Sequence, residues 1–277
     1  MKLSDVRLLV KDFNKSLEFY TQKMGFERLF NTDGFEGFKV SDNIAPYLAI
    51  FESDYMAAVV GNMSQQQPTT DYREKLEIAF SVRNVDASYN ALKEKDVEFI
   101  NEPFDWECAG IRCVHFRDPD GNLLSLVGNY EEDIKDDSLK FESLGLLVND
   151  FQKSLQFYTE KLGLETNWND DTCYASFKVA KGADTLAIFT STMNAETIGN
   201  ADKPFPPANS REKIMFTFEV ECVDTVYETL KAKGVAFINE PFDWTDACMR
   251  AVHFRDAEGN LIEIHAGLDC KEGSECC

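Results

Sequence analysis

The sequence predicts an α+β protein made of two tandem modules, each a pair of βαβββ units forming a half-barrel-based cavity. Three observations support this prediction. The chain matches itself when it is shifted by 138 residues, and strand-like and helix-like segments follow one another in the same order in both copies. The length of 277 residues, of which 44% are hydrophobic, is enough for two packed domains.

The repeat is visible in long identical segments. Residues 99–106 recur unchanged as residues 237–244, and residues 115–118 recur as residues 253–256. Two units are too few for a solenoid, so a duplicated domain is the better interpretation. The expected boundaries are module 1 at 1–130, an acidic linker at 131–138, module 2 at 139–268 and a cysteine-containing tail at 269–277.

Each copy is expected to begin with a strand and a helix. Asp12 is a suitable helix N-cap, Phe13, Leu17 and Tyr20 follow on one helical face, and Gly25 ends the helix. A second helix is expected to carry Val85, Tyr89 and Leu92 on its apolar face, with Asp86 as its cap. The expected strands of copy one lie near 3–10, 35–41, 46–52, 97–101, 111–117 and 122–128. A tight turn at 118–122, with Pro and Gly, joins the last two strands.

These motifs resemble the vicinal-oxygen-chelate (VOC) superfamily, which includes glyoxalases, bleomycin-resistance proteins and ring-cleaving dioxygenases. The segments that carry the resemblance are 10–13, 16–20, 25–27 and 116–124, which recur in copy two with Ala257-Glu258 in place of the Pro-Asp pair. The resemblance covers nearly the whole chain except the linker and the tail. It implies a small-molecule cavity between half-barrels, but the fold hosts many functions.

Composition narrows the possible partners. A net charge of −21 repels nucleic acid and anionic membrane surfaces, although solubility alone is sufficient reason for such acidity. No apolar run has the length of a membrane span, and the N-terminal residues lack a secretory signal, so a cytoplasmic protein is expected. The eight cysteines have no CxxC spacing and are expected to be reduced thiols, with Cys113 and Cys222 as small hydrophobes in strands.

The resemblance implies one divalent metal, held by His on the first strand, His or Gln on the fifth and Glu on the eighth. The matching positions here are Asp5 and Ser143, Glu77 and Met215, and Ser125 and Glu263. No grouping of these positions, within one copy or across copies, gives two nitrogens and a carboxylate. Asp5 with Glu77, or Asp5 with Glu263, would be a carboxylate pair able to hold Mg²⁺ or Mn²⁺. The cofactor is therefore left open between none and a divalent metal.

Glu263 and His265 are the candidate catalytic residues. They lie two positions apart on an expected strand, so their side chains point to the same face of the sheet. They would act as a general base with its partner or as two metal ligands, unless His265 is exposed at the strand end. His115 and His253, which are repeat-equivalent, are expected to be structural.

The candidate ligand-binding residues are two repeat-equivalent pairs, Trp106 with Trp244 and Arg112 with Arg250. The indoles would line the cavity or lock a strand connection. The arginines would pair a ligand carboxylate or form surface salt bridges.

Two functions remain open from the sequence. One is a binding protein similar to the bleomycin-resistance branch, which sequesters a small molecule without the usual metal triad. The other is a metal-dependent VOC enzyme, such as a lyase, isomerase or dioxygenase similar to lactoylglutathione lyase, with a carboxylate-rich site. Whether the chain is an enzyme is left open, and either a monomer or a homodimer is compatible with a fused pair of modules.

Overall fold

The computed structural model describes residues 1–32, 34–40, 47–106, 110–128, 139–179, 186–207, 210–245 and 248–268. The predicted linker at 131–138, the tail at 269–277 and Cys108 lie outside the described residues. The first copy contains β1 (Lys2–Val10), α1 (Phe13–Glu18), η1 (Phe19–Lys23), β2 (Glu27–Thr32), β3 (Phe35–Lys39), β4 (Tyr47–Glu52), α2 (Ser53–Val59), β5 (Leu76–Ser81), α3 (Val85–Lys93), β6 (Phe104–Trp106), β7 (Ile111–Arg117) and β8 (Leu123–Gly128).

The second copy repeats this order of elements. It contains β9 (Lys140–Val148), α4 (Phe151–Gln156), η2 (Phe157–Lys161), β10 (Thr166–Asn169), β11 (Tyr174–Phe177), β12 (Leu186–Thr190), α5 (Thr192–Ala195), β13 (Ile214–Glu219), α6 (Val223–Ala232), β14 (Phe242–Trp244), β15 (Met249–Arg255) and β16 (Leu261–Gly267). Four βαβββ units are therefore present, which confirms the predicted α+β fold class.

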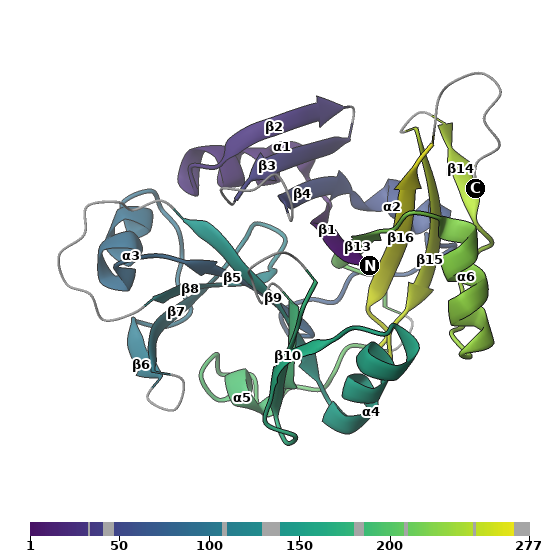
Figure 1. Cartoon of the computed structure of the whole chain (residues 1–277). Coiled ribbons are helices and arrows are strands. Elements are labelled where there is room, and N and C mark those ends of the chain that lie inside the picture. Colours follow the sequence, from purple (N-terminus) through teal and green to yellow (C-terminus); the bar gives the residue numbers. More distant parts are fainter. Residues whose placement is uncertain are drawn as a thin grey trace.

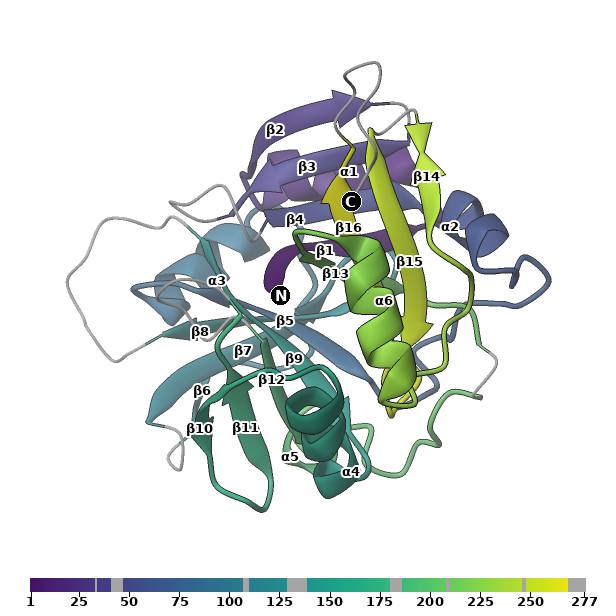
Figure 2. The same cartoon turned by 45° about the vertical axis from the view of Figure 1, so that its right-hand side comes forward.

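The four units pair between copies. Sheet A has the strand order β14-β15-β16-β13-β1-β4-β3-β2, and sheet B has the order β10-β11-β12-β9-β5-β8-β7-β6. The antiparallel pairs β1–β13 and β5–β9 join the two halves of each sheet. Each eight-stranded sheet thus combines one unit from each copy, as the views in Figure 1 and Figure 2 show.

Helices cover one face of each sheet. Helices α1 and α6 pack on sheet A, and helices α3 and α4 pack on sheet B. Side chains that alternate toward these helices, such as Val6 and Phe216 in sheet A, belong to the main hydrophobic core. We call the opposite side of each sheet its inner face. A smaller apolar cluster on the inner face of sheet A includes Leu9, Phe51 and Met56.

The turns that carry the family motif connect the two sheets within each copy. The Tyr20 hydroxyl of η1 donates to Asp118 Oδ2 at 2.8 Å, and the Ser16 hydroxyl donates to Asp120 Oδ2 at 2.9 Å. In copy two the Tyr158 hydroxyl donates to Asp256 in the same way, at 2.6 Å. In copy one the motif therefore holds a helix on sheet A against a turn of sheet B, and in copy two it holds a helix on sheet B against a turn of sheet A. The same turns also close the tight hairpins.

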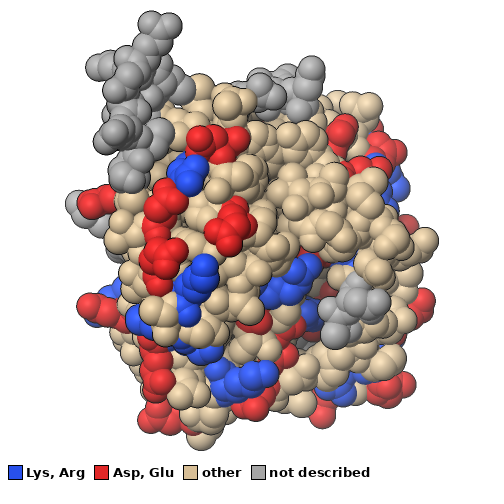
Figure 3. All heavy atoms as spheres, turned by 90° about the vertical axis from the view of Figure 1, so that its right-hand side faces the viewer, with Lys and Arg blue, Asp and Glu red and all other residues tan. Residues whose placement is uncertain are grey.

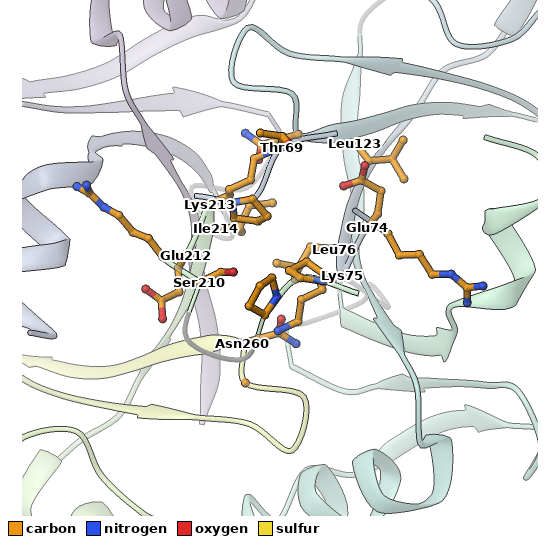
Figure 4. A pocket seen from close by; sticks show the side chains of 17 residues that line it. Thr69, Glu74, Lys75, Leu76, Leu123, Ser210, Glu212, Lys213, Ile214 and Asn260 are labelled. Carbon is orange, nitrogen blue, oxygen red and sulfur yellow. The ribbon is translucent and has the colours of Figure 1, made fainter. Parts of the chain in front are cut away.

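Two half-buried lysines connect the copies. Lys75 Nζ donates to the carbonyl oxygen of Glu258 at 2.6 Å, and so reaches from copy one to the turn of copy two. Lys75 and its equivalent Lys213 line a pocket of about 70 Å³ between the copies (Figure 4). Burial lowers the pKa of both lysines. The small volume and the role of Lys75 in holding a turn identify this region as part of the junction between copies.

Some local predictions were wrong. Residues 97–101 form no strand, and Phe99 makes a single bridge to Phe116 instead. The cap of α3 is Asn84, whose side chain accepts from the Ala87 amide at 3.0 Å, and Asp86 lies within the first turn of the helix, where Arg112 binds it. Cys222 precedes α6 at its N-cap position and is not in a strand, whereas Cys113 is buried in β7 as expected. Within the described ranges, no helix is long and apolar enough to cross a membrane.

The exchange of units between copies predicts that neither copy folds by itself as a compact monomer. Fragment 1–130 would expose the edges of β1 and β5, and fragment 139–268 would expose the edges of β9 and β13. We expect each fragment to self-associate, and a mixture of both to form a 1:1 complex, when measured by size-exclusion chromatography with light scattering. A fragment that is monomeric and unfolds cooperatively at the temperature of the full chain would contradict this.

Candidate functional site

A buried polar cluster lies on the inner face of sheet A. Its members are Asp5 and Arg7 on β1, Thr217 on β13, His253 on β15 and Glu263 on β16. All five are buried, with at most 6% of any residue exposed. Strand alternation places them on the face opposite the helices, since their neighbours Val6, Phe216 and Ile262 enter the main core. Charged groups are rarely buried to this extent unless they are paired.

The Arg7 guanidinium connects the two carboxylates of the cluster. Its Nε donates to Asp5 Oδ1 at 2.6 Å, and its Nη2 lies 3.0 Å from Glu263 Oε1. The Thr217 hydroxyl donates to the other Asp5 oxygen at 2.7 Å. The guanidinium also stands 5.3 Å from the centre of the Phe35 ring. Arg7 thus supplies the positive charge between two buried acids from different copies.

Hydrogen bonds fix the tautomer of His253. Its backbone amide donates to Asn239 Oδ1 at 2.9 Å, so the Asn239 amide nitrogen faces the ring and donates to Nδ1 at 3.0 Å. The ring proton therefore sits on Nε2, which donates to Glu263 Oε2 at 3.0 Å. His253 acts as a hydrogen-bond donor to the buried carboxylate.

The cluster keeps Glu263 ionised. Burial opposes the charged form, but the Arg7 cation and the His253 hydrogen bond outweigh it and lower the pKa of Glu263 to about 2. Burial also opposes the charge on Arg7, yet Asp5 and Glu263 together raise the pKa of its guanidinium. A carboxylate with so low a pKa is a weak general base at neutral pH.

Two half-buried side chains border the cluster. The Tyr47 hydroxyl donates to Asp5, and burial together with that carboxylate raises the pKa of Tyr47 above its ordinary value. His265 lies on the same face of β16 as Glu263, as predicted from their spacing. Its Nε2 atom is buried and has no hydrogen-bond partner among the described residues. Tyr47 and His265 are the half-buried polar groups beside this cluster.

The inner face of sheet B lacks the charged set. The repeat-equivalents of Asp5, Arg7 and Glu263 are Ser143, Gly145 and Ser125. The Phe189 ring fills the space beside Gly145, where an added Cβ would lie 2.5 Å from a ring carbon. All three charges of sheet A are therefore replaced together by small neutral residues.

Sheet B holds the remaining metal candidate, Glu77. Its Oε1 lies 3.6 Å from His115 Nε2, and Cys113 Sγ lies 3.8 Å from the same nitrogen. Asp5 and Glu77 are in different sheets, so the structure brings Asp5 together with Glu263 and does not bring it together with Glu77. The sequence left open whether the metal-ligand positions group within one copy or across copies. In the structure, each sheet brings together positions from both copies.

The residues of sheet A do not fit a divalent metal as they are arranged. The guanidinium of Arg7 contacts both candidate carboxylates, and the His253 nitrogen nearest to them carries a proton. Within the part of the chain that the structure describes, no three His, Cys, Asp or Glu side chains form a group that could hold one ion. A metal ligand set would require Arg7 to leave and His253 to change its tautomer.

The predicted arginines lie at the outer edges of the sheets. Arg112 binds Asp86 at 2.6 and 2.7 Å and Asp105 at 2.5 Å, which fastens α3 to β6 and β7. Arg250 binds Asp224 and Asp243 in the equivalent arrangement. Figure 3 views the side of the molecule that bears α6 and β14 and shows acidic and basic side chains interleaved there. These contacts favour the salt-bridge interpretation, and a role in ligand binding stays a prediction.

The two tryptophans differ in their surroundings. The Trp244 ring stacks on Tyr55 of α2 with centroids 5.4 Å apart, and its Nε1 donates to the Tyr55 hydroxyl at 3.0 Å. This contact joins β14 of copy two to α2 of copy one beside the inner face of sheet A. Trp106 is half-buried, and its ring lies 6.3 Å from that of Phe104.

Arg7 is the residue that sequence reasoning missed. It alternates with Val6 and Leu8 in an apolar strand, and a charged residue at such a position is a signal of a buried ion pair. Its equivalent Gly145 is a second signal, since the residues that follow, 8–10 and 146–148, are identical in the two copies.

Comparison with known proteins gives consistent matches. The family described as "Glyoxalase/Bleomycin resistance protein/Dioxygenase superfamily" matches residues 2–126 and 140–264. The uncharacterised protein YraH of Bacillus subtilis is 37% identical over 131 residues, which are 47% of this chain and 100% of YraH. The virulence protein STM3117 of Salmonella typhimurium is 26% identical over 145 residues, covering 52% of this chain and 94% of that protein. The crystal structure of glyoxalase I from Zea mays superposes with a TM-score of 0.66 at 14% identity, over 96% of this chain and 92% of that one, which is a likeness of fold.

The low pKa of Glu263 predicts an acid-sensitive contribution to stability. Because its pKa in the folded protein is about 2 and its ordinary value is 4.5, the contribution is fully present above pH 4.5 and is lost as the pH falls toward 2. We expect Glu263→Gln to be less stable than wild type at pH 7, with the difference shrinking by on the order of 3 kcal/mol between these limits.

Urea unfolding at a series of pH values measures this difference. The exposed Glu98 provides the control, because Glu98→Gln removes a carboxylate that is accessible to water. An unchanged difference between wild type and Glu263→Gln across this pH range would show that the cluster does not stabilise the carboxylate.

Proposed function

The chain belongs to the glyoxalase/bleomycin resistance protein/dioxygenase superfamily, and on this premise we propose that it binds a small molecule on the inner face of sheet A without a metal ion. The observation that carries the proposal is the polar cluster itself. Buried ion pairs contribute little net stability compared with apolar residues of similar size. Arg7 with its two acids occurs on only one of the two repeat-equivalent faces, within the described residues, whereas the other face has Glu77 beside His115, and this difference favours a functional role for sheet A.

The site offers both polar and apolar contacts. His265 Nε2 and the Tyr47 hydroxyl supply hydrogen-bonding groups at the border of the buried cluster. Phe35, Phe51 and the Trp244–Tyr55 stack supply aromatic surface near them. A compact organic molecule with an apolar body and one or two hydrogen-bonding groups fits this combination. The acidic chain, with a net charge of −21, favours a neutral or cationic molecule.

A binding role agrees better with the cluster than a catalytic one. Glu263 is fixed as an anion by Arg7 and His253, so it does not readily accept a proton at neutral pH. We therefore propose that His265 contacts the ligand directly. Glu263 would hold Arg7 and His253 in position beneath the ligand. We expect no turnover of a hemithioacetal by this protein.

The proposal predicts that His265 contributes to the affinity for the ligand and that its repeat-equivalent in sheet B, Val127, does not. A thermal-shift screen of neutral and cationic aromatic compounds, run with a chelator present, would first provide a ligand. We expect His265→Ala to weaken binding of that ligand about tenfold, because one hydrogen bond to a buried group is lost. Titration calorimetry measures the change.

The repeat-equivalent Val127→Ala is the matched control and should leave the affinity within about twofold, since Val127 is a half-buried residue of sheet B, away from the proposed site. Equal losses in both variants would contradict binding on sheet A. Binding or turnover that appears only with Ni²⁺, Mn²⁺, Fe²⁺ or Zn²⁺, and that is lost in Glu263→Ala, would favour the metal-dependent enzyme instead.

A further inference from the structure

A second, polar cleft lies beside the loop that precedes β5. Its volume is about 630 Å³, which is within the range of small-molecule sites. It is lined by residues 10–11, 52–54 and 63–67 of copy one and by Arg211 of copy two. The described residues that line it include no member of the buried polar cluster of sheet A. The cleft is therefore a separate place on the molecule.

The backbone beside the cleft is the same in both copies. The Arg211 amide donates to the Gln66 carbonyl oxygen at 3.0 Å, and the repeat-equivalent Arg73 amide donates to the Pro204 carbonyl oxygen at 2.8 Å. Two equivalent arginines thus start from equivalent positions against the loop of the other copy. Any difference in their surroundings comes from side chains.

In copy two, the loop fully engages its arginine. The Arg73 Nε donates to the Lys203 carbonyl oxygen at 3.1 Å, and its Nη2 donates to the carbonyl oxygen of Ala201. The Phe205 ring completes this contact, with its centre 5.1 Å from the guanidinium carbon. The aromatic ring and two loop carbonyls therefore surround this guanidinium.

In copy one, Gln67 stands where copy two has Phe205. Its Nε2 donates to the carbonyl oxygens of Leu9 at 2.7 Å and of Glu212 at 2.9 Å, which fixes the orientation of the amide. Gln67 is 5% exposed and lines the cleft, yet its Oε1 accepts no hydrogen bond among the described residues. A buried acceptor without a donor is costly, so this oxygen indicates a place for a donor from outside the chain.

The guanidinium of Arg211 is only half used on its Nε–Nη2 side. In Arg112 the same two nitrogens hold both oxygens of Asp86, at 2.6 and 2.7 Å. In Arg211 the Nη2 contacts one oxygen of Asp54, and the buried Nε has no acceptor among the described residues. The Asp54 side chain is 77% exposed, whereas that of Arg211 is 12% exposed. Because an ion pair with so exposed a partner is weak, another carboxylate can replace Asp54 and occupy both nitrogens.

We infer that this cleft binds a small zwitterion of the free amino acid class. The ligand carboxylate takes the Nε–Nη2 side of Arg211, and the released Asp54 together with Glu52 receives the ligand ammonium. The unpaired Gln67 oxygen is a further acceptor on the same wall. Cationic Lys11 and Arg211 balance the two acids of the lining, so a molecule that carries both charges fits better than a simple anion or cation.

Amino acids themselves are the probes for this site. We expect a thermal-shift screen of the soluble L-amino acids, each at about 10 mM, to find at least one that raises the Tm of the full chain. Calorimetry then compares that amino acid with its α-carboxamide and with its deaminated analogue. Each analogue lacks one of the two charges, and we expect each to bind at least about tenfold more weakly, because a charge-assisted contact is lost.

Two variants locate the binding in the cleft. Gln67→Phe introduces the residue of copy two and fills the space, and Arg211→Gln removes the guanidinium. We expect both to weaken binding at least about tenfold. The matched control is Arg73→Gln, which changes the equivalent arginine and should leave the affinity within about twofold. If Arg211→Gln does not fold, Gln67→Phe and the two analogues still decide the question.

The outcomes separate this cleft from the proposed site on sheet A. His265→Ala should leave amino acid binding unchanged, because His265 lies on the inner face and does not line the cleft. The inference is overturned if no amino acid binds, if the analogues bind as tightly as the amino acid, or if Gln67→Phe retains full affinity. A loss in His265→Ala would assign the amino acid to sheet A and overturn it as well.

Discussion

The antiparallel pairing of β1 with β13, and of β5 with β9, is the constraint on which the rest of the molecule depends. It places one unit of each copy in each sheet and so brings Asp5 and Arg7 of copy one beside Glu263 and His253 of copy two. A pairing of units within each copy would have separated these groups. The polar cluster, and any function that uses it, therefore exists only because the copies exchange halves.

The two sheets of this chain serve as an internal comparison. Both inner faces keep a buried histidine whose Nδ1 faces an asparagine, His253 with Asn239 and His115 with Asn101. They differ in the charges around it: in sheet A the histidine contacts Glu263, which is paired with Arg7, whereas in sheet B it lies 3.6 Å from Glu77 and the position equivalent to Arg7 is Gly145. The common scaffold is thus separable from the specific site, and the specific site lies where Arg7 joins two buried carboxylates.

Much of the fold could be predicted from the sequence because both copies keep the Asp-Phe start of the first helix and the Asp and Gly of the tight turn. The strands 111–117 and 123–128 agree closely with prediction, and the helix capped by Asp12 begins where expected. The region 97–101 was wrong because a single bridge at Phe99 replaces the expected ladder. The pairing between copies could not be chosen, since sequence periodicity does not specify which unit meets which. Arg7 was missed for the same reason, because its role depends on an ion pair with Glu263, which lies more than 250 positions away in the sequence.

Because the chain is synthesised from its N-terminus, the strand pairs between the two copies can form only after a delay. Strand β1 ends at Val10, but its partner β13 begins only at Ile214. At 5–20 residues per second a ribosome needs roughly 10–40 s to supply that partner. During this interval the nascent chain carries an uncovered strand edge and an arginine without its second carboxylate. Strand pairs between residues so far apart in sequence form slowly. We therefore expect chaperones to protect the exposed strand edge during synthesis.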